Sequence, residues 1–400
     1  MNKWLSAAAV VVLSLAMILG VACGGGGGED EVGVKEVKFG AGLPLSGLYG
    51  AVLGIPQRQG YELAADLIGE FTVAGQSYKW KPIFENNGWS SEGGVASGTK
   101  LIFENGVKIM TQCGGDSAVA AQTICEEAGV ILFTIGVPME AFGPDKHHTF
   151  QPQPGPYPQA AALFKYINEA RPELKTAAAV GETGTTGTML AEAAADAAKY
   201  FGLEWLGIEY FDPLGTTEFY PIATKMMTKN PDICYMDTRP LAAMREMGWE
   251  GTSFFGLWAT SYGEGIDSED MDGYLCYYPA PYGEGLPEAI EEIAAEYEQR
   301  FSVEFEQMAL YSVLQLYFLT DALQKAGTVD DVDQIIATLE TETFDSPIGP
   351  VKFGLENLDG IGHQCLMPCQ VGEIRGGEYH RVFELSTEEG EALAMEIWGE

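Results

Sequence analysis

Short apolar runs alternate with stretches of helical periodicity along nearly the whole chain from residue 34 onward. Runs bounded by glycine, proline or polar turn residues predict buried strands. The predicted strands are 34–42, 80–86, 107–112, 130–135, 176–181, 205–211, 232–236, 254–258, 348–353, and a hairpin over 369–383 that turns at Gly376 and Gly377. The predicted helices are 57–68, 91–104, 118–127, 157–169, 187–201, 219–228, 240–247, 286–301, 309–326 and 332–339, with an acidic helical end from residue 386. This alternation predicts an α/β fold with two doubly wound parallel-sheet lobes.

Two stretches carry more specific expectations. Residues 44–54, which are rich in glycine and proline, are expected to form a loop before the helix 57–68. The helix 91–104 is expected to direct four apolar side chains into the core. These are Val95, Leu101, Ile102 and Phe103.

The stretch 107–136 combines a buried strand, a glycine turn, a helix and a second buried strand. Gly114 and Gly115 leave bare backbone N–H groups at the start of the helix, beside the hydroxyl of Ser117. Because a helix N-terminus attracts negative charge, this turn is a candidate site for a carboxylate or phosphate. Asp116 or Ser117 is expected to cap the helix. The alternative is a tight turn that binds no ligand.

The N-terminus has the features of an export signal over residues 1–22. Lys3 is followed by an apolar run over 5–19, which is too short for a membrane span, and by small residues before Cys23. The segment 19–23 resembles the bacterial lipoprotein signal, although Gly20 stands where that signal usually has leucine. The resemblance implies that Cys23 is lipidated and that 23–34, with its run of five glycines, is a flexible tether to a membrane surface.

The formal net charge of −36 limits the partners of the chain. No basic patch interrupts the acidic residues, which excludes nucleic acid as a partner. A free anion would be repelled by such a chain, so a carboxylate site needs a local cation.

Cysteine usage leaves three interpretations open. Cys365 and Cys369 are close enough in sequence for a local disulfide, while Cys113 and Cys125 fit buried free thiols. A metal site that joins Cys365 and Cys369 to His363 is disfavoured, because no second cysteine pair completes a tetrahedral set. The sequence therefore predicts no metal and no cofactor.

Several short motifs, in a fixed order over residues 35–385, are similar to those of the leucine/isoleucine/valine-type substrate-binding proteins of bacterial ABC importers. They are FGAGLPLSG at 39–47, NGVK at 105–108, EEAGVIL at 126–132, TEF at 217–219, NPDI at 230–233 and SPIGPV at 346–351. The resemblance implies the periplasmic-binding-protein type I fold, in which two lobes close on a small ligand about a hinge. It also implies an ABC permease in the membrane as partner, a monomer, and a position in the periplasm or at the outer face of the membrane.

In that fold three chain crossings join the lobes. The resemblance places them near Pro154, Pro281 and Gly354. The first lobe is then 35–154 plus 282–353, and the second is 155–281 plus 354–400.

Ligand contacts are carried over from the family residue by residue. In the first lobe they fall on Gly115, Asp116, Ser117, Thr134, Gly136 and Val137, with a wall formed by Ser46 and Tyr49. In the second lobe they fall on Thr186, where relatives usually have tyrosine, and on Asp237, Arg239, Trp258 and Tyr278.

The second-lobe residues depart from the family in a way that bears on the ligand. Amino-acid-binding relatives have an acidic residue for the ammonium where this chain has Leu257 and Trp258. Arg239 offers a bidentate grip for a carboxylate, so an apolar or aromatic acid fits better than leucine, while Asp237 keeps amino acids open. The competing interpretations are a solvated loop arginine, a core position for Trp258, and a packing role for either Tyr277 or Tyr278.

Catalysis has little support in the sequence. The loop 181–187 lacks the lysine that ends a phosphate-binding loop, and no histidine is placed beside a plausible nucleophile. We therefore expect a binding protein and no enzyme. The alternative function is a ligand sensor of the same fold, which would signal through a separate membrane partner.

Overall fold

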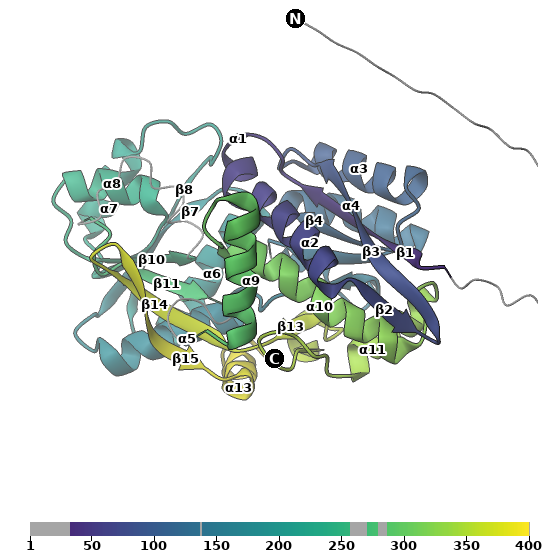
Figure 1. Ribbon diagram of the computed structural model, residues 1–400. Helices are drawn as coiled ribbons and strands as arrows, with labels where there is room; N and C mark the ends of the chain where they lie inside the picture. Colours follow the sequence, from purple (N-terminus) through teal and green to yellow (C-terminus); the bar gives the residue numbers. More distant parts are fainter. Residues whose placement is uncertain (1–32, 137, 257–269, 279–285, 400) are drawn as a thin grey trace, which may run out of the picture. The chain divides into compact units, whose positions relative to one another are not determined.

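Two large β-sheets organise the described part of the chain (Figure 1). The computed structural model describes residues 33–136, 138–256, 270–278 and 286–399. Both sheets belong to one unit that begins at Val34. The predicted fold class, α/β with two parallel-sheet lobes, is confirmed.

The first sheet has the order β2-β3-β1-β4-β5-β6 and is parallel except for the β2–β3 hairpin. Its strands are β1 (Lys35–Leu43), β2 (Glu70–Val73), β3 (Gln76–Asn86), β4 (Ile109–Cys113), β5 (Ile131–Ile135) and β6 (Thr149–Phe150). Every residue of β4 and β5 is buried. A strand that is covered on both faces has a continuous run of apolar residues. For this reason the predicted strands 107–112 and 130–135 agree with β4 and β5 to within two residues.

The second sheet has the order β15-β14-β11-β10-β9-β7-β8. Its strands are β7 (Thr176–Glu182), β8 (Glu204–Phe211), β9 (Ile233–Tyr235), β10 (Thr252–Gly256), β11 (Leu275–Tyr278), β14 (Cys369–Arg375) and β15 (Glu378–Leu385). The first five are parallel, and β14 and β15 run antiparallel at one edge. Gly376 and Gly377 turn this hairpin at φ angles of 60° and 83°, which confirms the predicted turn. Two short strands, β12 (Lys352–Gly354) and β13 (Gln364–Leu366), pair separately.

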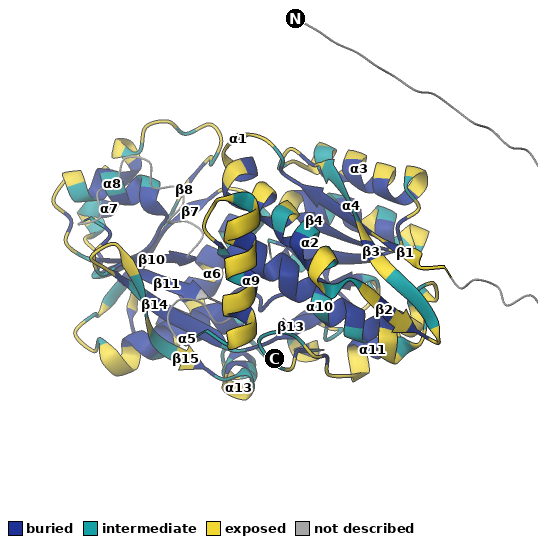
Figure 2. Cartoon of the chain, in the orientation of Figure 1, coloured by how far each residue is buried: buried dark blue, intermediate teal, exposed yellow. Residues whose placement is uncertain are grey.

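Helices cover the sheets, and two helices of the C-terminal half, Glu288–Phe301 and Gln307–Ala326, return to pack against the first-sheet helix Ile55–Ile68 (Figure 1). Their bounds are α1 (Gly47–Tyr49), α2 (Ile55–Ile68), α3 (Ser91–Thr99), α4 (Gly115–Ala128), α5 (Pro156–Ala170), α6 (Thr185–Tyr200), α7 (Tyr220–Lys229), α8 (Thr238–Glu246), α9 (Glu288–Phe301), α10 (Gln307–Ala326), α11 (Val332–Thr341), α12 (Glu356–Asp359) and α13 (Thr387–Trp398). The long helix α10 is buried along most of its length, whereas α9 exposes one side (Figure 2).

Helix α10 ties the C-terminal half to the first sheet through specific contacts. Tyr61 of α2 donates its hydroxyl hydrogen to Gln315 at 2.6 Å, and the Trp80 indole of β3 donates to Thr320 at 2.8 Å. Gly60 allows close packing, because a Cβ there would lie 2.4 Å from the Ala309 carbonyl oxygen. Helix α10 therefore packs with elements of the first sheet. The lobe boundaries 35–154 plus 282–353 and 155–281 plus 354–400 stay a prediction.

The expected loop at 44–54 is wrong, because most of it is helical. Helix α1 continues through a π-helical turn at Gly50–Gly54 into α2. A Cβ on Gly54 would lie 1.6 Å from the Pro44 carbonyl oxygen, so the glycine permits the helix to pack back against the chain before it. The glycines that suggested a loop serve close packing.

The predicted core face of helix 91–104 is wrong for two of its four residues. Leu101 is buried, as is Ile102, but Val95 is 42% exposed and Phe103 is 68% exposed. Helix α3 turns small residues inward instead, including Gly94 and Gly98. A π-helical turn at Lys100–Glu104 follows and shifts the helical phase, so a uniform period misplaces the side chains around it.

The sequence missed the hairpin that carries β2. Ala74 and Gly75 form its turn at φ angles of 49° and 84°. Of these two residues, only glycine is typical of such a turn, so the sequence gives a weak signal. The predicted strand 348–353 is also shorter in the structure, where β12 covers Lys352–Gly354. The predicted helical end is confirmed by α13, which begins with a capping box between Ser386 and Glu389.

The six cysteines in the described residues are all free and buried. The local Cys365–Cys369 disulfide is therefore wrong, while the buried thiols Cys113 and Cys125 are confirmed. His363 stacks on Phe150 at 3.8 Å, and its ring nitrogens contact the Thr149 carbonyl oxygen and the Glu340 carboxylate. No group of three potential metal ligands occurs within the described residues.

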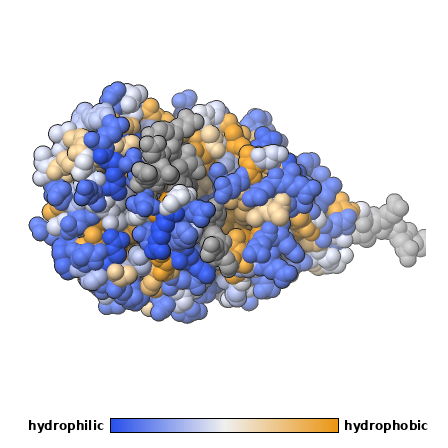
Figure 3. Space-filling model, turned by 60° about the vertical axis from the view of Figure 1, so that its left-hand side comes forward, coloured by the Kyte–Doolittle hydropathy of each residue, from blue (hydrophilic) through white to orange (hydrophobic). Residues whose placement is uncertain are grey.

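Within the ranges that the structure describes, none of the helices has the length and apolar character that crossing a bilayer requires. Hydrophilic side chains predominate on the face drawn in Figure 3, as the high acidic content leads one to expect.

Candidate functional site

Loops at the carboxyl ends of four strands meet at one place. In the first sheet β4 leads into Gly114, and β5 leads into Gly136. In the second sheet β7 ends at Glu182, and β9 leads into Asp237. Open parallel sheets place ligands beyond the carboxyl ends of their strands, so these loops form the candidate site.

A cavity lies among these loops, with about 610 Å³ of empty space that is partly open to solvent. Residues from both sheets line it, and most of the exposed lining is apolar. They are Leu53, Trp89, Cys113, Ile135, Gly136, Gln153, Gln159, Glu182, Thr186, Leu190, Tyr277, Gln307, Met308 and Tyr311. An apolar cavity with a few polar groups is the usual form of a small-molecule site.

The start of α4 differs from the sequence expectation. Gly114 is the cap residue, at a φ angle of 102°, and no side chain caps the helix. Ser117 instead donates to the carbonyl oxygens of Cys113 and Gly114 at 2.8 Å, and it accepts from the Asn87 amide at 3.2 Å. The cap predicted from Asp116 or Ser117 is therefore wrong, and the Ser117 hydroxyl is used to fix the turn.

Thr186, at the start of α6, bridges the loops of the two sheets. Its hydroxyl donates to the Gly136 carbonyl oxygen at 2.6 Å and accepts from the Gly115 backbone N–H at 3.1 Å. Beside it, the Asp116 carboxylate accepts from the Thr185 hydroxyl at 2.6 Å. Five of the residues predicted for the site, Gly115, Asp116, Ser117, Gly136 and Thr186, thus lie together.

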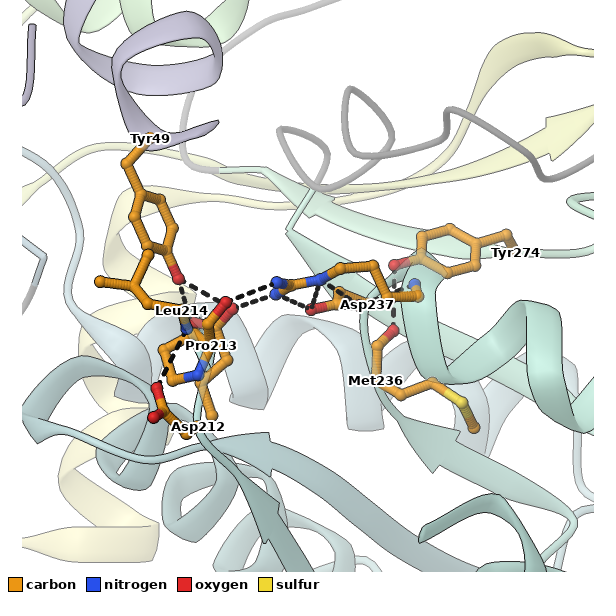
Figure 4. Close-up of polar contacts among 9 residues, drawn as sticks. Tyr49, Asp212, Pro213, Leu214, Met236, Asp237 and Tyr274 are labelled. Atoms are coloured by element: carbon orange, nitrogen blue, oxygen red, sulfur yellow. Dashed lines mark hydrogen bonds and ion pairs between the residues drawn. The ribbon is translucent and has the colours of Figure 1, made fainter. Parts of the chain in front are cut away.

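A second set of contacts centres on Glu182, which the sequence interpretation missed. Tyr49 and Asp237, which belong to this set, are labelled in Figure 4. The Tyr49 hydroxyl lies 3.1 Å from both oxygens of its carboxylate, and the Arg239 guanidinium pairs with it. Arg239 also bonds the Asp237 carboxylate at 2.6 Å and the Pro213 carbonyl oxygen at 3.1 Å. Tyr49, Asp237 and Arg239 therefore form one network, and the solvated-loop interpretation of Arg239 is wrong.

Burial governs the ionisation of this network. It raises the pKa of Glu182 to about 7, and the nearby Asp237 charge adds to that rise, while Arg239 and Tyr49 oppose it. Burial also raises the pKa of Asp237, against the lowering effect of its bonds to Arg239. Two carboxylates thus share one guanidinium, and Asp116 adds a third carboxylate close by.

Of the remaining predicted residues, Ser46 and Thr134 are described in full, and neither belongs to these contacts or to the cavity lining. Ser46 is exposed at the start of α1, and its side chain makes no capping bond. Thr134 is fully buried, donates to the Gln151 side chain at 2.9 Å, and is not among the residues that line the cavity. Val137 and Trp258 fall outside the described residues, and for Tyr278 only the backbone pairing with Gln370 is described.

Aromatic and amide residues of the cavity were also missed. Trp89 stacks on Tyr49 with ring centroids 4.2 Å apart, and Gln153 lies within the proline-rich stretch 151–158. Two of the missed residues carry a sequence signal, because residues at the carboxyl ends of parallel strands often contact ligands. Trp89 comes three residues after the end of β3, and Glu182 is the last residue of β7.

Comparisons with known proteins give a family and a fold. The model of the family described as periplasmic binding protein matches residues 36–378. A search of the curated proteins found no match.

Solved structures share the architecture at low sequence identity. A periplasmic binding protein from Burkholderia mallei is similar with a TM-score of 0.76 and 14% identity, over 89% of this chain and 96% of that one. A leucine binding protein from Thermotoga maritima has a TM-score of 0.74 and 16% identity, over 88% and 99%. An ABC transporter solute binding protein from R. palustris, solved with benzoate, has a TM-score of 0.73 and 15% identity, over 88% and 96%.

Proposed function

Because this chain belongs to the family of periplasmic binding proteins, we propose that it is the lipid-anchored solute receptor of an ABC importer. Proteins of this family bind solutes outside the cytoplasm and are not enzymes. In the proposed role the two lobes close about their hinge on a small carboxylate-bearing ligand, and the monomeric receptor delivers it to a membrane permease.

The observation that carries this proposal is the cavity among the strand-end loops of both sheets. Its lining comes from Leu53 and Trp89 on one side and from Glu182 and Leu190 on the other. A ligand held there would contact both sheets at once, so its binding energy would favour the arrangement in which the loops meet.

The charges around the cavity favour an amino acid over a simple acid. The leucine binding protein and the benzoate complex represent the two ligand classes expected from the sequence. Glu182 lines the cavity and lies among more carboxylates than cations, which attracts an ammonium group and repels a lone carboxylate.

In this arrangement the ammonium would lie at Glu182 and the carboxylate at the Gly115 backbone N–H, which Thr186 now occupies. The alternative grip on the carboxylate by Arg239 requires the guanidinium to leave Glu182 or Asp237. It is the less favourable arrangement, because it leaves a buried carboxylate without its partner.

A thermal-shift screen of the chain from Glu29 onward tests the proposal against the standard amino acids, small aromatic acids and dicarboxylates. A ligand at a hundred times its dissociation constant stabilises the folded state by about 2.7 kcal/mol. We expect such a shift with an amino acid. Absence of a shift with every member of the panel would contradict the proposal.

The proposed anchor has a separate test. In a bacterial host, labelled palmitate should be incorporated into the full chain and should be lost in Cys23→Ser. Equal labelling of the variant, or a membrane-free wild-type protein, would contradict lipidation at Cys23 while leaving the binding proposal intact.

A further inference from the structure

One buried amide in the cavity lacks the partner that burial normally requires. Gln153 lines the cavity and is only 6% exposed, and its side-chain oxygen has no hydrogen-bond partner among the described residues. Leaving a buried acceptor unpaired is unfavourable, and most such groups in folded proteins are satisfied. A group supplied from the cavity would satisfy it.

The segment that carries Gln153 is fixed in place. Two residues earlier, Gln151 donates its backbone N–H to the His363 carbonyl oxygen at 2.9 Å, and its own carbonyl accepts from Cys365 at 3.1 Å. The Gln151 side chain also accepts from Thr134 at 2.9 Å. These bonds fix the backbone two residues before Gln153, so little backbone entropy remains to be lost when a ligand binds its side chain.

The other amides of the cavity already bond within the protein. Gln159 donates to the Pro154 carbonyl oxygen at 2.6 Å, and Gln307 donates to the Tyr311 hydroxyl. Gln153 is therefore the amide of the cavity whose side-chain oxygen a ligand would hydrogen-bond.

Two of the polar residues that line the cavity are the charged Glu182 and the amide Gln153. Leu53, Ile135, Leu190 and Met308 are among the apolar residues that share the lining. We propose that the ligand is an amphipathic molecule with an ammonium at Glu182, an apolar or aromatic stem, and an O–H or N–H donor that bonds Gln153. This inference rests on the proposed function. It narrows the proposed ligands to amino acids whose side chain carries a hydrogen-bond donor.

Matched ligand pairs test the inference, because each pair differs mainly in the donor. Calorimetric titrations would compare L-tyrosine with L-phenylalanine, L-glutamine with L-methionine, and L-threonine with L-valine. Within any pair that binds, the compound with the donor should bind at least about tenfold more tightly than the compound without it. The compound without the donor leaves the Gln153 side-chain oxygen unpaired.

Two variants assign that preference to its residue. Gln153→Met keeps the side-chain length and removes the acceptor, so the affinity ratio within the pair should fall to about twofold or less. The matched control is Gln122→Met: Gln122 on α4 is buried to a similar extent, at 7% exposed, but it bonds Glu126 and is not among the cavity-lining residues. Its ratio should equal that of the wild type.

The possible results separate the two proposals. Equal affinity within every binding pair, or a preference that survives Gln153→Met, would overturn the inference and leave the receptor function standing. Failure of all six compounds, together with failure of the wider screen, would overturn the receptor function and this inference with it.

Discussion

At Glu182 two opposing influences meet on one carboxylate. Its burial and the neighbouring Asp237 disfavour the charged form, whereas Arg239 and the Tyr49 hydroxyl favour it. Together these influences give Glu182 a pKa of about 7, so its charge changes near neutral pH. Both the stability of the unliganded protein and its affinity for an ammonium should then depend on pH.

The first prediction concerns stability. The pKa of Glu182 is raised from 4.5 to about 7 in the folded protein, so the fold holds a proton that the unfolded chain releases. The contribution of Glu182 is therefore fully present below pH 4.5 and is lost as the pH rises to about 7. Urea unfolding at pH 5 and pH 7 should show a larger loss for the wild type than for Glu182→Gln.

The variant comparison isolates Glu182 from Glu306, whose pKa burial also raises to about 7. Glu306 is present in both proteins, so its contribution cancels. A difference between wild type and variant that stays constant from pH 5 to pH 7 would contradict the assignment.

The second prediction concerns binding. Glu182→Gln should weaken the affinity for an amino acid about ten- to a hundredfold, the range typical of a hydrogen bond to a charged group. In the wild type the affinity should rise from pH 6 to pH 8 as Glu182 ionises. Isothermal titration of both proteins at these pH values measures the two effects.

Glu192→Gln is the control for this substitution, because Glu192 is exposed on α6. It should bind like the wild type. An unchanged affinity in Glu182→Gln would rule out the ammonium site.

At the scale of elements, α3 shows how the turn at the start of α4 is held. A Cβ on Gly94 would lie 2.2 Å from the Ser117 carbonyl oxygen, so the helix packs directly on the backbone of the turn. The absence of a side chain allows this approach. The site's first-sheet loop therefore depends on a glycine one helix away.

The third prediction follows from that contact. Gly94→Ala should lower the free energy of unfolding by about 1–3 kcal/mol through overpacking. On the same helix, a Cβ on Gly98 would meet Ala121 at 3.5 Å and the Gln112 amide at 3.8 Å, both ordinary contacts, so Gly98→Ala should be neutral or stabilising by about 0.5–1 kcal/mol. Equal effects of the two substitutions in urea unfolding would contradict the packing argument.

The elements themselves were accessible from the sequence, because apolar periodicity is a local property. Strands such as β4 and β5 were located within one or two residues, and so was α10. The helical stretch from Gly47 and the exposed Phe103 were not, because π-helical turns and close glycine contacts depend on what the chain packs against.

Part of the candidate site could also be predicted from the sequence, because some of its residues belong to local patterns. The turn around Gly115 and Ser117 has a local pattern, and family motifs pointed to Thr186, Asp237 and Arg239. Glu182 and Gln153 gain their importance only when loops of two sheets converge, which no single stretch of sequence displays.

At the scale of the whole molecule, specific hydrogen bonds join the strand-end loops of the two sheets. Thr186 connects to both Gly115 and Gly136, and Tyr49 connects to Glu182. Each bond of this kind contributes on the order of 1 kcal/mol, so the equilibrium between open and closed lobes should respond to a single substitution.

The fourth prediction tests that response. Thr186→Val removes both of the bonds made by the hydroxyl and should enlarge the radius of gyration of the unliganded protein in X-ray scattering. The control is Thr224→Val, whose hydroxyl bonds within α7 to the Tyr220 carbonyl oxygen at 2.7 Å. A radius equal to that of the wild type and the control would show that Thr186 does not hold the loops together.

The most direct test of the account is a crystal structure of the chain from Glu29 onward with its tightest-binding amino acid. We predict ligand density in the cavity lined by Leu53, Trp89, Glu182 and Leu190, with the ammonium at the Glu182 carboxylate. Density for that ligand elsewhere on the molecule, with this cavity empty, would contradict it.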